Sequence, residues 1–135
     1  MDKTNRFSIA VIIKHPNIDP AEITKALSLT PSVALKAGDT RLTPRGTVLA
    51  GVHKGTTWSY VADHETKSGF SDAISDLASK LVLQLPFFER LSKEGGRSEI
   101  CLRLPGEGHQ GDALNPELLA KIARLGCHLG VEVFP

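Results

Sequence analysis

Two kinds of hydrophobic periodicity alternate along this chain, and their order constrains its fold more than any other feature of the sequence. In residues 7–14 and 97–104, apolar side chains recur at every second position, as in a strand with one buried face. From Phe70 to Leu81, apolar residues instead recur at the spacing of one helix face. A chain that carries both periods must pack helices against a sheet to bury both kinds of apolar face.

Prolines and cap residues mark two further helices and a break in the long one. Asp19-Pro20 supplies an N-cap and a proline at the first helical position, and the helix it opens must end before Pro31. Asn115-Pro116 opens another helix in the same way. Pro86 interrupts the long helical pattern, so residues 87–93 form either a kinked continuation or a separate short helix.

The segment of residues 32–55 contains short strand-like pieces separated by glycine and proline turns. Residues 56–61 are rich in β-branched and aromatic side chains, which predicts a strand with Trp58 and Tyr60 on one face. We expect this strand to form a hairpin with the residues before it, over residues 47–62.

The predicted elements follow the order βαββαβαβ and end on a strand that carries Leu129, Val131 and Val133. A chain of 135 residues has the length of one domain, so we expect residues 1–135 to form a single α+β domain. Hairpin-linked and crossover-linked strands are mixed in this order. The prediction is therefore a two-layer sandwich, with a mixed or antiparallel sheet and helices on one face. The first six elements have ferredoxin-like order.

Charge and hydropathy disfavour two classes of partner. The chain has 16 Lys and Arg residues against 15 Asp and Glu residues, so its net charge of +1 creates no overall field that attracts polyanions. Aromatic residues are 5% of the chain, too few for the stacking platform of an RNA-binding sheet. We find neither a signal-peptide pattern nor an apolar stretch of the roughly 20 residues that a bilayer span needs. We therefore expect a cytoplasmic protein that binds neither nucleic acid nor membrane.

The sequence offers no recognisable cofactor, metal or catalytic motif, and we assign none. Residues 106–111 match G-x-G-x-x-G, but the helix cap at Asn115 lies downstream and Glu107 would meet the phosphates. Cys101 and Cys127 lack zinc-site spacing, and we interpret them as buried or half-buried free thiols. The histidines also lack metal-site spacing; they are His15, His53, His64, His109 and His128.

One segment departs from the even balance of charge. Residues 36–54 contain five basic or imidazole side chains and a single acid, Asp39, and the only tryptophan and tyrosine follow at Trp58 and Tyr60. Cationic groups beside an aromatic face can hold a carboxylate, a phosphate or an acidic protein segment. The alternative is a solvated hairpin whose tryptophan packs under the helices. The basic or imidazole residues are Lys36, Arg41, Arg45, His53 and Lys54.

A set of short motifs spans most of the chain: Phe7-Ser8-Ile9-Ala10-Val11, Asp19-Pro20, Ile23-Thr24, Leu27-Ser28-Leu29-Thr30-Pro31, Lys36-Ala37-Gly38-Asp39, Trp58-Ser59 and Val131-Glu132-Val133. In these motifs the chain resembles a family of short bacterial proteins defined only as a domain of unknown function. The resemblance brings no known activity, but it implies that residues 31–39 and Trp58 belong to one shared feature. With the basic segment, it leads to the candidate binding residues Lys36, Gly38, Asp39, Arg41, Arg45, His53, Trp58 and Tyr60.

The leading hypothesis is a non-enzymatic binding or protein-interaction module with a basic and aromatic surface near Trp58. Its partner would be a protein or a small anionic ligand, and an exposed sheet edge would allow a homodimer. The alternative is a small-molecule sensor or enzyme, with a pocket between sheet and helices that uses Trp58, Tyr60, Lys36 and His53.

Overall fold

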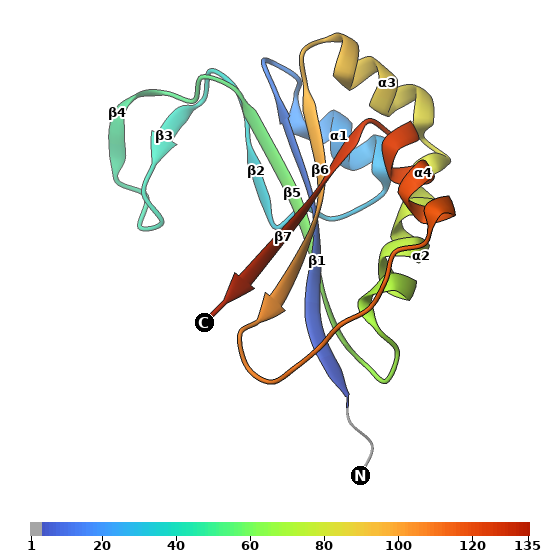
Figure 1. Cartoon of the computed structure of the whole chain (residues 1–135). Coiled ribbons are helices and arrows are strands. Elements are labelled where there is room, and N and C mark those ends of the chain that lie inside the picture. Colours follow the sequence, from blue (N-terminus) through green and yellow to red (C-terminus); the bar gives the residue numbers. More distant parts are fainter. Residues whose placement is uncertain (1–3) are drawn as a thin grey trace.

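The computed structural model describes residues 4–135, which form a five-stranded sheet, a separate two-stranded sheet and four helices (Figure 1). In chain order the elements are β1 (Asn5–His15), α1 (Pro20–Leu27), β2 (Val33–Leu35), β3 (Thr40–Leu42), β4 (Val48–Val52), β5 (Thr56–Thr66), α2 (Phe70–Val82), α3 (Leu85–Lys93), β6 (Arg97–Pro105), α4 (Pro116–Arg124) and β7 (Cys127–Phe134).

The large sheet has the strand order β2-β5-β1-β6-β7. Its central strand β1 pairs antiparallel with β5 and β6, β2 pairs antiparallel with β5, and β7 runs parallel to β6. The helices all lie on one face of this sheet (Figure 1). The predicted α+β class, with a mixed sheet and helices on one face, is therefore confirmed.

Alternation along β1 places the core where the sequence predicts it. Phe7, Ile9, Val11 and Ile13 share the face that the helices cover, and all four are buried. Helix-borne side chains meet them from the other layer; those that are buried are Ile23, Ile74, Ala78, Leu81, Phe88, Leu91, Leu118 and Ile122.

The predicted hairpin over residues 47–62 is wrong. β4 pairs with β3, whereas β5 pairs with β1 along its whole length and with β2 near its start. Pairing with β1 sets Trp58 opposite Ile13 and beneath the helices. This arrangement buries Trp58 completely, whereas every residue of β4 is exposed.

The helix starts follow the predicted capping chemistry. The Asp19 side chain accepts a hydrogen bond from the Ala21 N–H at 2.9 Å, and Asn115 Oδ1 accepts one from the Leu118 N–H at 2.8 Å. The Ala21 amide, assisted by nearby Lys36, lowers the pKa of the Asp19 carboxyl.

The structure also decides whether the residues after Pro86 continue the long helix with a kink or form a separate helix. α3 is a separate helix that begins at Leu85 with the proline in its first turn, where a missing N–H costs no hydrogen bond. None of the helices formed by residues 4–135 is both long and apolar enough to cross a bilayer.

Candidate functional site

Trp58 lies in the core and not on a surface. Its side chain has 0% exposure, and its indole Nε1–H donates a hydrogen bond to Thr24 Oγ1 of α1 at 3.0 Å. The prediction of an aromatic binding surface at Trp58 is therefore wrong, because the face of β5 that carries this ring is the face that the helices cover. The alternative, in which the tryptophan packs under the helices, is the arrangement observed.

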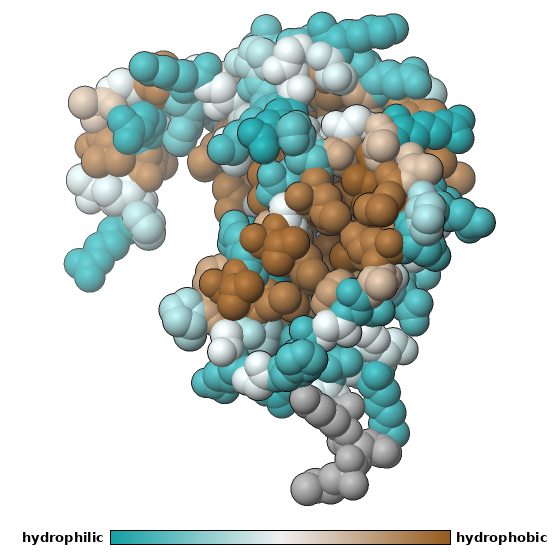
Figure 2. All heavy atoms as spheres, in the orientation of Figure 1, coloured by the Kyte–Doolittle hydropathy of each residue, from teal (hydrophilic) through white to brown (hydrophobic). Residues whose placement is uncertain are grey.

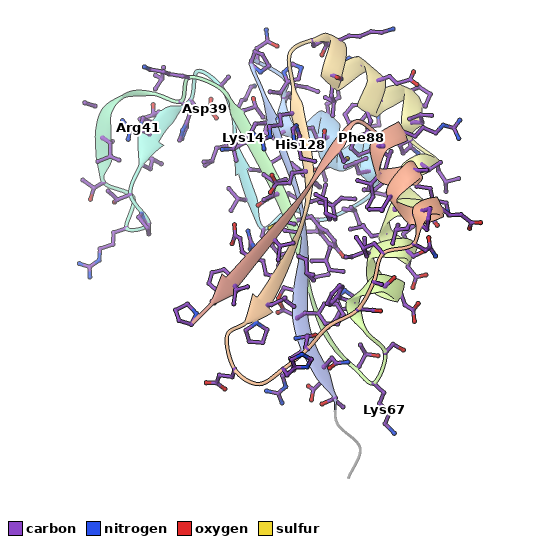
Figure 3. All side chains as sticks on the ribbon, viewed as in Figure 1. Lys14, Asp39, Arg41, Lys67, Phe88 and His128 are labelled. Carbon is purple, nitrogen blue, oxygen red and sulfur yellow. The ribbon has the colours of Figure 1, made fainter. Side chains whose placement is uncertain are left out.

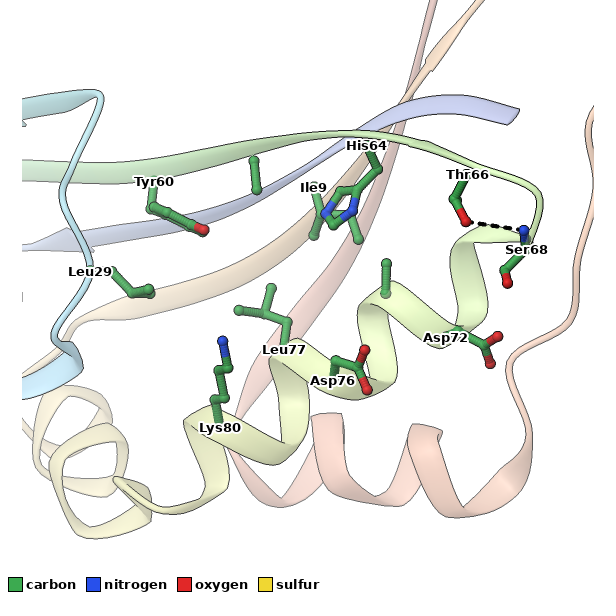
Figure 4. A pocket seen from close by; sticks show the side chains of 13 residues that line it. Ile9, Leu29, Tyr60, His64, Thr66, Ser68, Asp72, Asp76, Leu77 and Lys80 are labelled. Atoms are coloured by element: carbon green, nitrogen blue, oxygen red, sulfur yellow. Dashed lines mark hydrogen bonds between the residues drawn. The ribbon is translucent and has the colours of Figure 1, made fainter. Parts of the chain in front are cut away.

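Tyr60, two residues further along β5, is half-buried and lines a cleft of about 500 Å³ between the sheet and α2. Figure 4 shows Tyr60 and His64 extending from β5 on one side, with Asp76 and Lys80 on α2 on the other. A pocket thus lies between sheet and helices, as the enzyme or sensor hypothesis expects. Tyr60 is the one residue of that predicted set in this cleft, because Trp58 is enclosed in the core and neither Lys36 nor His53 lines the cleft.

The motif at residues 36–39 and His53 form the base of a projecting hairpin. The Gly38 N–H donates to the His53 carbonyl at 2.8 Å, and the His53 N–H donates to the Asp39 carbonyl at 3.0 Å. Gly38 has a φ of +87°, a conformation that glycine adopts without a steric penalty. Lys36 Nζ lies 3.4 Å from the Asp19 carboxylate, which holds this base against the start of α1.

Thr56 also anchors this base, a structural role that the sequence does not predict. Its side chain is buried, its hydroxyl donates to the Ile18 carbonyl, and it accepts a hydrogen bond from the Ala37 N–H at 3.2 Å. A threonine at the start of a strand is also typical of simple β-propensity, so the sequence carries no signal that separates the two roles.

We call residues 40–52 the arm: they comprise β3, β4 and the turn between them, and they project from the body of the molecule (Figure 1). Figure 3 marks Asp39 at the base of the arm and Arg41 on its first strand. The Arg41 guanidinium donates to the Ala50 carbonyl across the arm at 3.2 Å, and Arg45 lies in the turn at its tip. Basic side chains are thus spread along the arm and its base and are not gathered in one pocket.

The arm also carries exposed apolar side chains. Leu42 is opposite Val48 in the ladder, and Thr40 is opposite Val52. Opposed residues in antiparallel strands project to the same side, so Leu42 and Val48 share one face, and a register shift separates this pair from Val52. Val48 is 69% exposed and Leu42 is 56% exposed. Figure 2 shows brown, apolar surface on the arm, which projects away from the body of the molecule.

The arm has nothing packed over this apolar face among the residues that the structure describes. A two-stranded hairpin alone is marginally stable in water. Fully burying a valine or leucine side chain contributes about 1.5–3 kcal/mol relative to leaving it exposed. A partner that covers the arm would therefore gain binding free energy and also stabilise the hairpin.

Comparison with known protein families places the whole of this architecture in one family. Residues 5–133 match the family described as a domain of unknown function (DUF4279). The chain belongs to this family. The match includes the sheet, the helix layer, the arm and its base, so the resemblance seen in the sequence is confirmed at the level of the family. Neither the curated proteins nor the solved structures contain a match to this DUF4279 domain.

The two cysteines of the DUF4279 domain are suited to packing and not to nucleophilic chemistry. Cys101 is buried and Cys127 is partly buried, as the sequence predicts. Burial raises the pKa of the Cys127 thiol to about 12, and burial together with nearby Glu132 and Glu99 raises that of Cys101. Both thiols are therefore protonated near neutral pH, whereas a reactive cysteine must be a thiolate.

We expect both thiols of the native DUF4279 domain to react with a thiol reagent at pH 8 at least about 100-fold more slowly than a free cysteine. In denaturant the two should react at the ordinary rate. Stopped-flow absorbance with a chromogenic disulfide measures both rates. Rapid labelling of either thiol in the folded protein would show that the thiol is accessible and reactive, and would contradict its description as a buried packing residue.

Metal chemistry finds no support among residues 4–135, where no three His, Cys, Asp or Glu side chains are grouped closely enough to hold an ion. The loop at residues 106–111 is an almost wholly exposed connection between β6 and α4. It precedes the Asn115 cap by several residues, so its glycines do not supply the amides at the start of α4.

Proposed function

We propose that this DUF4279 domain is a non-enzymatic protein-interaction module and that the arm is its recognition element. The observation that carries the proposal is the exposed apolar pair Leu42 and Val48, which stand opposite each other on one face of the arm, with Val52 also exposed nearby on β4. Exposed apolar patches framed by polar residues are typical of protein-binding surfaces. Two backbone hydrogen bonds, from Gly38 to His53 and from His53 to Asp39, support a fixed base from which the arm projects.

The basic residues indicate the chemistry of the partner. Arg41 and Arg45 lie on an arm that contains no acidic residue, and its base carries His53 and Asp39. Guanidinium groups form strong charge-assisted hydrogen bonds with carboxylates. The proposed partner is therefore a protein segment that combines apolar side chains with Asp or Glu. Because the basic groups are spread along the arm, an extended acidic segment fits them better than a small anion does.

The arm proposal predicts a selective loss of binding. In quantitative affinity capture, proteins that bind the wild type should be depleted at least about tenfold with the double variant Leu42→Ser and Val48→Ser. Loss of two buried apolar contacts would produce this change, since 1.4 kcal/mol corresponds to tenfold in affinity. The melting temperature should change little, because both side chains are exposed in the free protein.

Leu83→Ser provides a matched control, since Leu83 is 78% exposed and lies at the end of α2, away from the arm in sequence. This variant should capture the same proteins as the wild type. The Arg41→Ala and Arg45→Ala double variant should weaken capture mainly at low salt, because exposed charges act through screened attraction. Equal profiles for the arm variants and the wild type would refute the role of the arm.

The second candidate function is small-molecule binding in the cleft beside α2. It is favoured by the variety of ionisable groups that line this cleft, including Tyr60, His64, Asp72, Asp76 and Lys80. These groups include two carboxylates, so the cleft suits a ligand with cationic or mixed polar groups better than a simple anion. The two candidates are distinguishable, because Asp76→Asn would affect a ligand in the cleft and leave binding through the arm unchanged.

A further inference from the structure

The two edges of the large sheet are built very differently. The edge strand β2 has only three residues, which is one way in which proteins prevent unwanted strand pairing. The opposite edge strand, β7, has eight residues, contains no proline, and pairs with β6 without a register shift. Its only Asp, Glu, Lys or Arg residue is Glu132. This long and regular edge lacks the usual protection against pairing with another strand.

The face of β7 next to this edge is apolar and uncovered. Leu129, Val131 and Val133 stand opposite Ile100, Leu102 and Leu104 of β6, so they point to the helix side of the sheet. The β6 residues Ile100 and Leu102 are buried, but exposure of the three β7 side chains ranges from 39% at Leu129 to 63% at Val133.

The helix layer therefore stops short of β7. Figure 2 shows the result as a broad brown area along β7 and beside α4. Leu119 of α4 is also exposed, whereas Phe134 follows Val133 in the strand and therefore points to the opposite face of the sheet. An exposed apolar patch of this kind is typical of a surface at which proteins associate.

We propose that a second copy of this chain pairs antiparallel with β7 about a two-fold axis, which joins two five-stranded sheets into one. If Val131 faces the partner subunit's Val131, Leu129 faces the partner subunit's Val133. The apolar face of the strand thus matches itself, as a two-fold interface requires. Both helix layers then lie on the same side of the joined sheet, because residues with the same parity meet across the axis.

Charge and side-chain size agree with this register. Glu132 faces the partner subunit's Gly130, so no like charges meet across the strand pair. Within its own chain, the Glu132 carboxylate lies 3.7 Å from the Arg103 guanidinium, which offsets its charge. A second copy also explains why the whole face is apolar, since homodimer interfaces are more apolar than transient ones. An unrelated peptide would use the edge but leave the α4 side of the patch uncovered.

Analytical ultracentrifugation of the full chain tests this proposal. The wild type should sediment as a species of twice 14.5 kDa that dissociates on dilution. Val131→Lys places two cations at the axis and should raise the dimer dissociation constant at least about 100-fold. Leu83→Lys is the control, since Leu83 is 78% exposed at the end of α2 and belongs to neither proposed surface, and it should remain dimeric. A wild type that is monomeric at all concentrations, or a dimer that Val131→Lys leaves intact, would overturn the proposal.

A second variant keeps the test independent of folding defects. Val131→Cys should form an intermolecular disulfide under mild oxidation, because paired strands at the axis bring the two α-carbons within disulfide range. Leu83→Cys, at an exposed position outside both proposed surfaces, should not crosslink to a comparable extent, and non-reducing electrophoresis compares the two variants. Equal crosslinking of both variants, or open-ended multimers, would contradict a closed two-fold pair at β7. These outcomes do not depend on the arm, so they are separate from the test of the proposed function.

Discussion

Replacing Trp58 by alanine is expected to lower the free energy of unfolding by about 3–5 kcal/mol, the usual cost of truncating a fully buried tryptophan. The side chain has no exposed area and is among the largest in the core. Small domains have total stabilities of about 5–15 kcal/mol, so this variant should lose a large share of its stability. Urea unfolding followed by far-UV circular dichroism measures the change.

A second variant at Trp58 distinguishes the contribution of ring packing to stability from that of the indole hydrogen bond. Trp58→Phe removes the indole N–H that donates to Thr24 Oγ1 and preserves part of the ring volume. Its cost should be clearly smaller than that of Trp58→Ala. Tyr60→Ala provides a comparison on the same strand face, where the side chain is only half-buried. If Trp58→Ala proved as mild as Tyr60→Ala, the ring could not be enclosed as the structure shows.

Replacing His15 by leucine is expected to lower the free energy of unfolding by about 2–4 kcal/mol, because it leaves two backbone amides without an acceptor. The ring is buried, and its Nδ1 accepts hydrogen bonds from the N–H groups of Asn17 and Ile18 at 3.1 and 2.9 Å. With Nδ1 accepting, Nε2 carries the proton and donates to the Glu94 carboxylate at 2.9 Å. His15 thereby shapes the turn that leads from β1 into α1.

Glu94→Gln is the control for the His15 prediction. The Glu94 side chain is partly exposed and also pairs with Arg90, and these contacts lower the pKa of its carboxyl. A glutamine still accepts the His15 hydrogen bond, so this variant should cost less than about 1 kcal/mol at neutral pH. Denaturant unfolding of both variants tests the contrast. Equal losses would mean that the outward contact of His15, and not its two backbone contacts, carries the stability.

The two proposed surfaces have different consequences for how the domain works. The arm follows β2, and β7 forms the opposite edge of the sheet. A pair of copies joined at β7 would therefore present its arms at the two far ends of the joined sheet. Linked binding elements gain in overall affinity when one target offers two matching sites.

Several elements of the fold were determined by local sequence. The alternation from Phe7 to Lys14 depends only on side chains two apart, and the Asp19 and Asn115 caps satisfy amides within three residues. Such short-range patterns are readable without tertiary contacts, so the strand at β1, the capped starts of α1 and α4, and the α+β class were predictable.

Tertiary structure alone decided which strands pair and which side chains remain exposed. Trp58 and the basic residues of the arm are close in sequence. Trp58 is nevertheless buried, because β5 pairs with the central strand β1, whereas β4 pairs only with β3 and stays exposed. Leu129 and Val131 have the pattern of a buried strand, yet they remain exposed because the helix layer ends before β7. Alternation specifies that a face is apolar, but what covers that face depends on segments distant in sequence.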